Sequence, residues 1–108
     1  MQLRKNWKGF VNTMAKLTAI TVLQEAAKLK EQKSKDYQGS KWSEEDYFPF
    51  GSISYVHMIH TKYLRMRSLV ERDNDAEVNF EALEDTLIDM SVYCAMFAAF
   101  IINAKEDT

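Results

Sequence analysis

Apolar residues recur every three or four positions along three long stretches of this chain. The first stretch has Phe10, Met14, Leu17, Ile20, Leu23 and Ala27, the second has Val56, Ile59, Tyr63, Met66 and Val70, and the third has Phe80, Leu83, Leu87, Met90, Cys94, Phe97 and Ile101. This spacing is typical of helices that bury one face. We therefore predict three long helices, at about 10–35, 52–71 and 77–103, each with the named stripe facing a core.

The second half of the third helix is apolar on a further face. Val92, Met96, Ala99 and Phe100 lie away from the stripe that ends at Phe97 and Ile101. A helix that is apolar all round has to be buried on every side, and three helices cannot do this well. The pattern therefore predicts a homo-oligomer, a dimer or tetramer, in which the helices of several copies complete a bundle.

The segment between the first two helices is predicted to be an aromatic-rich loop. Turn-forming residues enclose five aromatic rings, which are Tyr37, Trp42, Tyr47, Phe48 and Phe50. Residues 43–46 are expected to form one helical turn, and Ser52 to cap the second helix. So many rings must fold onto the helices. We expect Phe48 and Phe50 to fill the core, and Trp42 and Tyr47 to be the rings best suited to stack on a base.

Composition supports an all-α protein with a single domain, residues 1–108. Three Gly, one Pro and an apolar content of 46% leave few breaks between helices. The single cysteine, Cys94, excludes an intrachain disulfide and is predicted to be a small buried apolar residue. The first residues do not have the pattern of a signal peptide, and the apolar run 92–102 is shorter than the roughly 20 residues of a membrane span. We therefore expect a cytoplasmic protein without membrane association.

Charge is distributed unevenly along the chain. Residues 1–35 contain eight lysines and arginines and two acidic residues, whereas residues 71–108 contain two basic and ten acidic residues. This asymmetry favours packing of the first helix beside the last, within one chain or between two. A net charge of −2 argues against DNA binding.

The acidic part of the third helix contains the candidate metal ligands. Glu81, Asp85 and Asp89 are spaced by four residues and share one face. A solvated acidic face explains the first of them. Asp89 differs, because the same face continues as Val92 and Tyr93, so its carboxylate lies where burial begins and needs a cation or a metal ion. Asp85 and Asp89 are therefore the candidates for a Mg²⁺ site.

Lys62 and Arg65 are the candidate phosphate ligands on the second helix. They are three residues apart, and they follow the line of Tyr55, Met58 and Leu69 rather than the most polar face. They could pair with Asp85 and Asp89 across the two helices. They could also bind phosphates, for which Arg offers a planar fork and Lys a point charge. An ion-paired network that opens onto a cleft would do both.

A third candidate group, Lys35, Asp36 and Tyr37, lies where the first helix is predicted to end. A turn-forming Asp and a packing Tyr explain these residues structurally. A lysine-rich helix end beside several rings would also suit a nucleotide, because base stacking on an aromatic contributes on the order of 1–3 kcal/mol. His57 and His60 have no third metal-ligating residue nearby in the sequence, so a structural role is favoured for them.

Taken together, Lys35-Asp36-Tyr37-x-Gly39, Gly51, Lys62-x-x-Arg65, Asp85-Thr86-Leu87-x-Asp89 and Tyr93 resemble the nucleotide modification associated domain 1 family. These are small helical phage and bacterial proteins linked to nucleotide metabolism. The helix order is more distantly similar to the MazG-like all-α nucleoside triphosphate pyrophosphohydrolases, which bind Mg²⁺ through acidic motifs on two helices. This chain departs from them, because Lys62 and Arg65 stand where acids are expected and Thr86 replaces a glutamate.

These observations predict a nucleotide-binding protein of phage or bacterial nucleotide metabolism or modification. Two alternatives remain open. The first is a non-catalytic sponge for a nucleotide signal or an inhibitor of a host protein. The second is a Mg²⁺-dependent pyrophosphohydrolase that releases a monophosphate and pyrophosphate. The sequence does not decide whether the protein is an enzyme.

Overall fold

The computed structural model describes residues 17–39, 41–72 and 80–106, and its elements are all helices. They are α2 (Ala19–Gln38), the short α3 (Glu44–Tyr47), α4 (Ser52–Val70) and α5 (Phe80–Glu106). Within these residues no strand occurs. The predicted all-α class is therefore confirmed. Residues 10–16, 73–76 and 77–79 of the predicted helices and turn lie outside the described part of the chain, as does the side chain of Tyr37.

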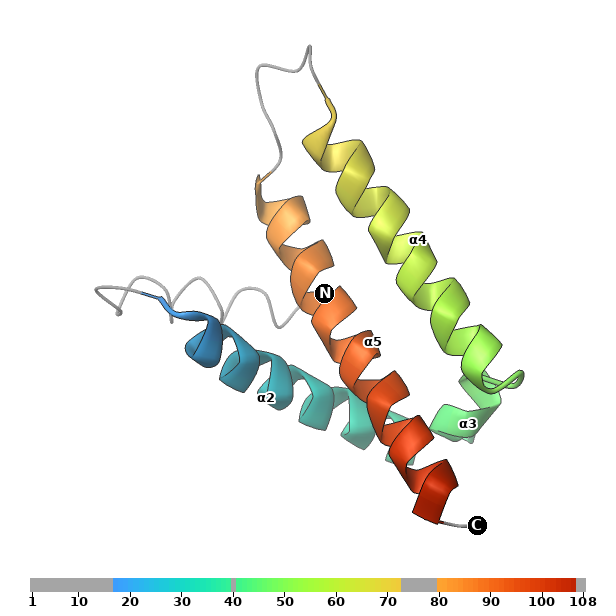
Figure 1. The fold of residues 1–108 in the computed structure, drawn as a ribbon. Coiled ribbons are helices and arrows are strands. Elements are labelled where there is room, and N and C mark those ends of the chain that lie inside the picture. Colours follow the sequence, from blue (N-terminus) through green and yellow to red (C-terminus); the bar gives the residue numbers. More distant parts are fainter. Residues whose placement is uncertain (1–16, 40, 73–79, 107–108) are drawn as a thin grey trace.

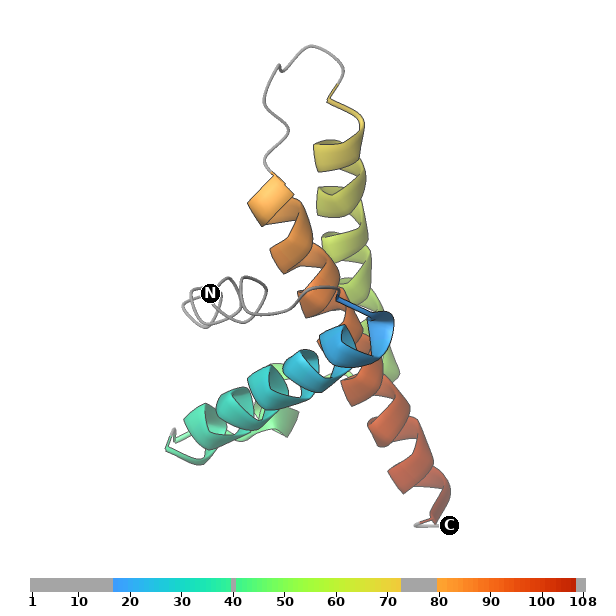
Figure 2. The same cartoon turned by 90° about the vertical axis from the view of Figure 1, so that its left-hand side faces the viewer.

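α5 is the central element of the fold. It packs along α4 and also contacts α2. Figure 1 shows α4 and α5 running antiparallel to each other, while α2 crosses α5 at a steep angle, and Figure 2 shows the same crossing from the side. The basic first helix therefore lies against the acidic last helix, as the charge asymmetry predicted.

The predicted loop contains the short helix α3, and one hydrogen bond at its start and another after its end fix its position. The backbone N–H of Ser43 donates to Asp46 Oδ2 at 2.8 Å, which satisfies a donor at the helix start. After α3 the N–H of Phe50 donates to Ser54 Oγ at 2.9 Å, and this bond ties the loop to the first turn of α4. The predicted single helical turn is thus confirmed.

α4 is capped by Gly51 rather than by the predicted Ser52. Gly51 has φ 62°, a left-handed conformation that side chains with a Cβ rarely adopt. A Cβ at this position would also lie 3.5 Å from the Phe100 ring of α5. That distance is an ordinary van der Waals contact, so it is the left-handed backbone at the entry into α4, and not the space beside α5, that favours glycine here.

A stack of aromatic rings holds the loop, α4 and α5 together. The Tyr55 ring lies parallel to Phe48, with centroids 4.4 Å apart, and parallel to Phe97 at 5.5 Å. Tyr55 and Phe48 belong to one core cluster with Ala26 and Leu29 of α2 and Val92 and Met96 of α5. Burial, followed by the nearby Glu44 and Glu45 carboxylates, raises the pKa of the Tyr55 hydroxyl above its usual value. The prediction that Phe48 fills the core is confirmed, whereas Phe50 is 77% exposed.

The core uses different helix faces from those that the apolar stripes predicted. On α2 the buried residues are Ala26 and Leu29, and on α4 they are Tyr55 and Leu69, while the predicted Ile20, Leu23, Val56, Tyr63 and Val70 are exposed. On α5 the buried residues are Thr86, Val92 and Met96, and the predicted Leu87, Cys94 and Ile101 are exposed. At about 100° per residue, the buried face of α5 is turned by roughly a third of a turn from its predicted stripe.

The position of Tyr55 in the stack predicts a large effect of its removal. Tyr55→Ala should lower the free energy of unfolding by about 3–5 kcal/mol, because it leaves a cavity between two rings. The matched control is Tyr47→Ala, since Tyr47 is half-exposed, and this change should cost less than about 1 kcal/mol. Urea unfolding followed by circular dichroism, at one protein concentration, measures both. Equal losses for the two variants would contradict the assignment of the core.

Candidate functional site

The predicted phosphate and metal ligands meet between α4 and α5. Lys62 Nζ lies 3.4 Å from Asp89 Oδ2, and the two side chains are only 25% and 13% exposed. Lys62 follows Tyr55 by seven residues and precedes Leu69 by seven, so it shares the face of α4 that packs on α5. The predicted pairing across the two helices is therefore confirmed for this lysine and aspartate.

The Lys62–Asp89 pair leaves part of its bonding capacity unused. Its separation is longer than the roughly 2.7–2.9 Å of a charge-assisted hydrogen bond. Asp89 Oδ1 is buried and has no hydrogen-bond partner among the described residues. A buried carboxylate oxygen without a partner is costly, and such an atom in a native structure requires an explanation. A bound cation or a donor from a ligand would supply the missing interaction.

Asp89 belongs to a polar line along the inner side of α5. Asp85 is one turn before it and Tyr93 one turn after it, so the three share a face. The Lys33 ammonium of α2 lies 3.4 Å from the Tyr93 hydroxyl and 4.7 Å from the centre of its ring. This face of α5 therefore meets a cation from α4 at Asp89 and a cation from α2 at Tyr93. We call Asp85, Asp89 and Tyr93, with Lys62 and Lys33, the polar track.

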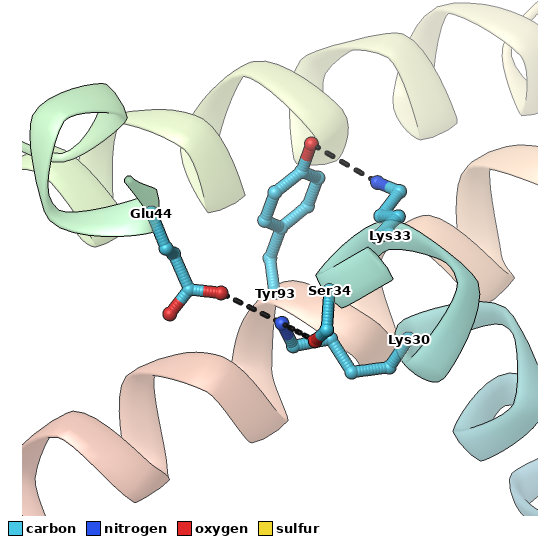
Figure 3. Close-up of polar contacts among 5 residues, drawn as sticks. All are labelled: Lys30, Lys33, Ser34, Glu44 and Tyr93. Atoms are coloured by element: carbon cyan, nitrogen blue, oxygen red, sulfur yellow. Dashed lines mark hydrogen bonds and ion pairs between the residues drawn. The ribbon is translucent and has the colours of Figure 1, made fainter. Parts of the chain in front are cut away.

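A second set of polar contacts joins α2 to α3 beside this track. Lys30 Nζ lies 2.6 Å from Glu44 Oε1 and 3.0 Å from Ser34 Oγ. Figure 3 shows Lys30, Ser34 and Glu44 next to the Lys33–Tyr93 pair, so lysines one turn apart on α2 reach α3 and α5. These contacts position α2 and α3, and they explain part of the lysine content of α2 in structural terms.

The other predicted ligand residues lie at the surface. Arg65 is exposed on α4, three residues after Lys62. Lys35 and Asp36 are exposed in the last turns of α2, and the Lys35 carbonyl accepts a hydrogen bond from the Gly39 N–H at 3.1 Å. The prediction that these residues lie at a helix end is confirmed. Among the described residues, no hydrogen bond or ion pair joins Arg65, Lys35 or Asp36 to Lys62 or Asp89.

The predicted stacking residues Trp42 and Tyr47 are about half-exposed. Trp42 lies beside the Lys41 ammonium, which is 5.4 Å from its ring centre. Tyr47 lines a shallow apolar pocket of about 650 Å³, whose wall continues with Phe50, Ile53 and His60. His60 lies about 160° around α4 from Lys62, at roughly 100° per residue. The structure therefore does not bring Tyr47 and Lys62 into one pocket.

The acidic residues of α5 offer few ligands for a metal ion. Among the described residues, no group of three or more His, Cys, Asp or Glu side chains comes together. Asp85 and Asp89, one helical turn apart, remain as two carboxylates on the polar track. Mg²⁺ is commonly held by one or two carboxylates, with water and ligand phosphates completing its shell. This pair of carboxylates fits one such ion. Asp89 Oδ1, which is buried and lacks a hydrogen-bond partner, is the oxygen best suited to bind it.

Arg67 and Glu71 form an ordinary surface ion pair outside the polar track. Arg67 lies 2.7 Å from Glu71 on the same helix, and both side chains are more than half exposed. Hydrogen bonds to Glu71 and then to Tyr63 raise the pKa of the Arg67 guanidinium. This pair provides an exposed counterpart on α4 to the largely buried Lys62–Asp89 pair.

Comparisons with known proteins give no match: no family model, curated protein or solved structure is similar to this chain. The resemblance to the nucleotide modification associated domain 1 family therefore stays a prediction. The polar track has to be interpreted from its own chemistry.

Breaking the Lys62–Asp89 pair should destabilise the fold. Lys62→Met leaves the Asp89 carboxylate buried without its cation and should lower the free energy of unfolding by about 1–3 kcal/mol. The double variant Lys62→Met/Asp89→Leu should recover most of this loss, because no charge then remains buried. As a control, Arg67→Met at the exposed pair should change stability little. If the double variant is less stable than Lys62→Met, the pair does not have the assigned role.

Proposed function

We propose that this protein binds a nucleotide or a closely related phosphate-bearing small molecule at the polar track between α4 and α5. Lys62 contacts a ligand phosphate, and Arg65, one turn further along α4, provides a second cation at the rim. Asp89, with Asp85, holds one Mg²⁺ ion that bridges to the phosphates. The observation that carries the proposal is the buried Asp89 Oδ1, which lacks a partner beside a long ion pair.

The charges of the track support a ligand that carries both anionic groups and a cation. A free phosphate alone would meet Lys62 but would be repelled by the Asp89 carboxylate beside it. A phosphate–Mg²⁺ complex avoids this repulsion, because the metal ion lies between the two anions. A ligand hydroxyl or amino group could also donate to Asp89 Oδ1, and a nucleotide has such groups in its ribose and base.

Binding without catalysis is the form of the proposal that the site supports best. Two carboxylates can hold one ion, whereas hydrolysis of a phosphoanhydride through two metal ions requires more acidic ligands. The polar track also contributes to the packing of α5 against its neighbours. Because the residues of the polar track also stabilise the fold, they are held in fixed positions, which suits a site that binds a ligand without changing conformation.

Equilibrium dialysis against a mixed nucleotide pool, with and without Mg²⁺, tests the proposal. We expect one class of nucleotide to accumulate unchanged on the protein side, and to accumulate less when Mg²⁺ is replaced by EDTA. New monophosphate and pyrophosphate would instead establish hydrolysis. If no nucleotide is concentrated or consumed, the polar track is an internal ion-pair network and the proposal fails.

Variants of two arginines on α4 distinguish the site from general charge attraction. Arg65→Ala should weaken binding of the retained nucleotide by roughly 10- to 100-fold, as expected for loss of a charged hydrogen bond. Arg67→Ala removes the same charge two residues away and should leave the affinity unchanged. Titration calorimetry of both variants, after circular dichroism has shown equal helix content, measures the difference. Equal weakening by both variants would contradict a specific site.

A further inference from the structure

The apolar pocket beside Tyr47 lies where the loop meets the start of α4, and we call it the loop pocket. Its volume is about 650 Å³, and its lining comes from residues 47–50 and from α4 residues between Ile53 and His60. Figure 1 shows α3 beside the first turns of α4, where these two parts of the lining meet. Pockets for small molecules have volumes of about 300–1,000 Å³ and are mostly apolar, with a few polar groups. The loop pocket has the size and composition of such a site.

The inner part of the loop pocket belongs to the core of the fold. Phe48 lines the pocket but is only 7% exposed, because its ring is stacked on Tyr55. Met58 also lines the pocket and packs against the same core. The N–H of Phe50 donates to Ser54 Oγ, and this bond fixes the loop wall of the pocket against α4. The shape of the pocket is therefore set by contacts of the folded chain and exists before a ligand binds.

The outer walls of the loop pocket expose apolar surface. Phe50 is 77% exposed and Ile53 64%, and Tyr47 and Val56 are about half-exposed. All four side chains line the same pocket. Removal of apolar surface from water is favourable in proportion to the area that is buried. A ligand with an apolar body would therefore gain affinity from each of these walls.

Two imidazoles provide polar groups beside this apolar lining. His57 and His60 follow Ile53 by four and seven residues on α4, so the three side chains share one face of the helix. Both histidines are exposed, and within the described part of the chain neither imidazole has a hydrogen-bond or ion-pair partner. A neutral imidazole has one N–H donor and a charged one has two. The two rings can therefore donate hydrogen bonds to oxygen atoms at one end of an apolar ligand.

The charges around the loop pocket favour an anionic group at that end of the ligand. No carboxylate belongs to the described lining, and α4 contains no Asp or Glu. On α3, Glu44 pairs with Lys30 of α2, and Asp46 accepts hydrogen bonds at the start of its own helix. Glu45 lies about 160° around α3 from Tyr47, at roughly 100° per residue. A carboxylate of a ligand would therefore meet imidazole donors without a repelling acid in the lining.

A lipid bilayer is the other environment that could cover exposed apolar side chains. The loop pocket is concave, however, whereas a bilayer is entered by side chains that project from the surface. By length and composition alone, Ala82–Glu106 could cross a membrane. This segment lies in α5, which contributes no residue to the lining of the loop pocket. The shape of the pocket therefore favours a dissolved small molecule.

We propose that the loop pocket binds an apolar monocarboxylate of the medium-chain fatty acid type. The apolar body of the ligand lies among Phe50, Ile53 and Val56, and its carboxylate accepts hydrogen bonds from His57 and His60. This site is separate from the proposed nucleotide site, because His60 lies on the side of α4 away from Lys62.

Equilibrium dialysis of the native protein against radiolabelled decanoate, below its micelle concentration, tests for the site. We expect saturable binding of one decanoate per chain. Decyltrimethylammonium has the same apolar chain and the opposite charge, and it should bind at least roughly 10-fold more weakly. Absence of decanoate binding, or equal binding of the two compounds, would overturn the proposal. So would flotation of the protein with phosphatidylcholine vesicles in the absence of decanoate binding, because the apolar walls would then belong to a lipid surface.

Two matched variants of α4 test the place of binding. Ile53→Asp introduces a carboxylate into the lining and should weaken decanoate binding by more than about 10-fold. Leu64→Asp makes the same change at a leucine that is 52% exposed on the same face of α4 but outside the lining, and it should leave the affinity unchanged. Both positions are exposed, so both variants should fold, and circular dichroism checks this. Equal affinities of the two variants would contradict the assigned site.

The double variant His57→Leu/His60→Leu tests the recognition of the carboxylate. It removes the imidazole donors and keeps an apolar lining, so decanoate binding should weaken roughly 10-fold. Binding of decanol, which has the same chain without the charge, should not weaken. If the variant binds decanoate as tightly as the native protein does, or loses both compounds equally, the assigned role of the imidazoles is wrong. These measurements contain no nucleotide, so the two proposals fail separately.

Discussion

The packing of this protein is constrained by one helix, α5, which is apolar on two faces. The chain provides α4 and α2 to cover α5, and both pack on its inner side. There the aromatic stack around Tyr55 fixes the loop and α4 against Phe97, while Val92 and Met96 complete the core. The outer side, with Leu87 and Ile101, faces away from these elements. The inner contacts thus determine the fold of one chain and leave apolar side chains of α5 exposed on its outer side.

The polar track lies within the contact between α4 and α5. Lys62 and Asp89 lie on the faces through which α4 and α5 pack, so the ion pair is part of the helix contact as well as of the proposed ligand site. A buried pair of this kind contributes little net stability by itself, because desolvation offsets much of the attraction. Its long separation and the unpaired Asp89 oxygen are easier to understand if a ligand completes the site. The proposed nucleotide site rests on this reasoning.

The positions of α3, α4 and α5 were predictable from the sequence, but the start of the first helix and the choice of buried face were not. The first helix was expected over 10–35, whereas residues 17 and 18 are not helical and α2 spans Ala19–Gln38. The bounds of α4 differ from the expected range by one residue, and α3 forms at the predicted turn. Each long helix, however, carries enough apolar residues for two stripes. Periodicity alone selects the more regular stripe, such as Leu87, Cys94 and Ile101, whereas the chain buries Val92 and Met96. The ring stack of Phe48, Tyr55 and Phe97 decides between them, and no local pattern reveals a contact among three distant segments. The Lys62–Asp89 contact was predictable, because Asp89 lies where its polar face becomes apolar.

The inner face of α5 is central to this account, because it stabilises the fold and carries the proposed ligand site at Lys62 and Asp89. The most direct test is the dependence of the urea unfolding midpoint on the concentration of added nucleotide and Mg²⁺. If a nucleotide binds the folded chain at the polar track, binding adds to the stability of the folded state, and the midpoint rises as the ligand concentration increases. A midpoint that is the same at all ligand concentrations, while the transition stays cooperative, would contradict the account.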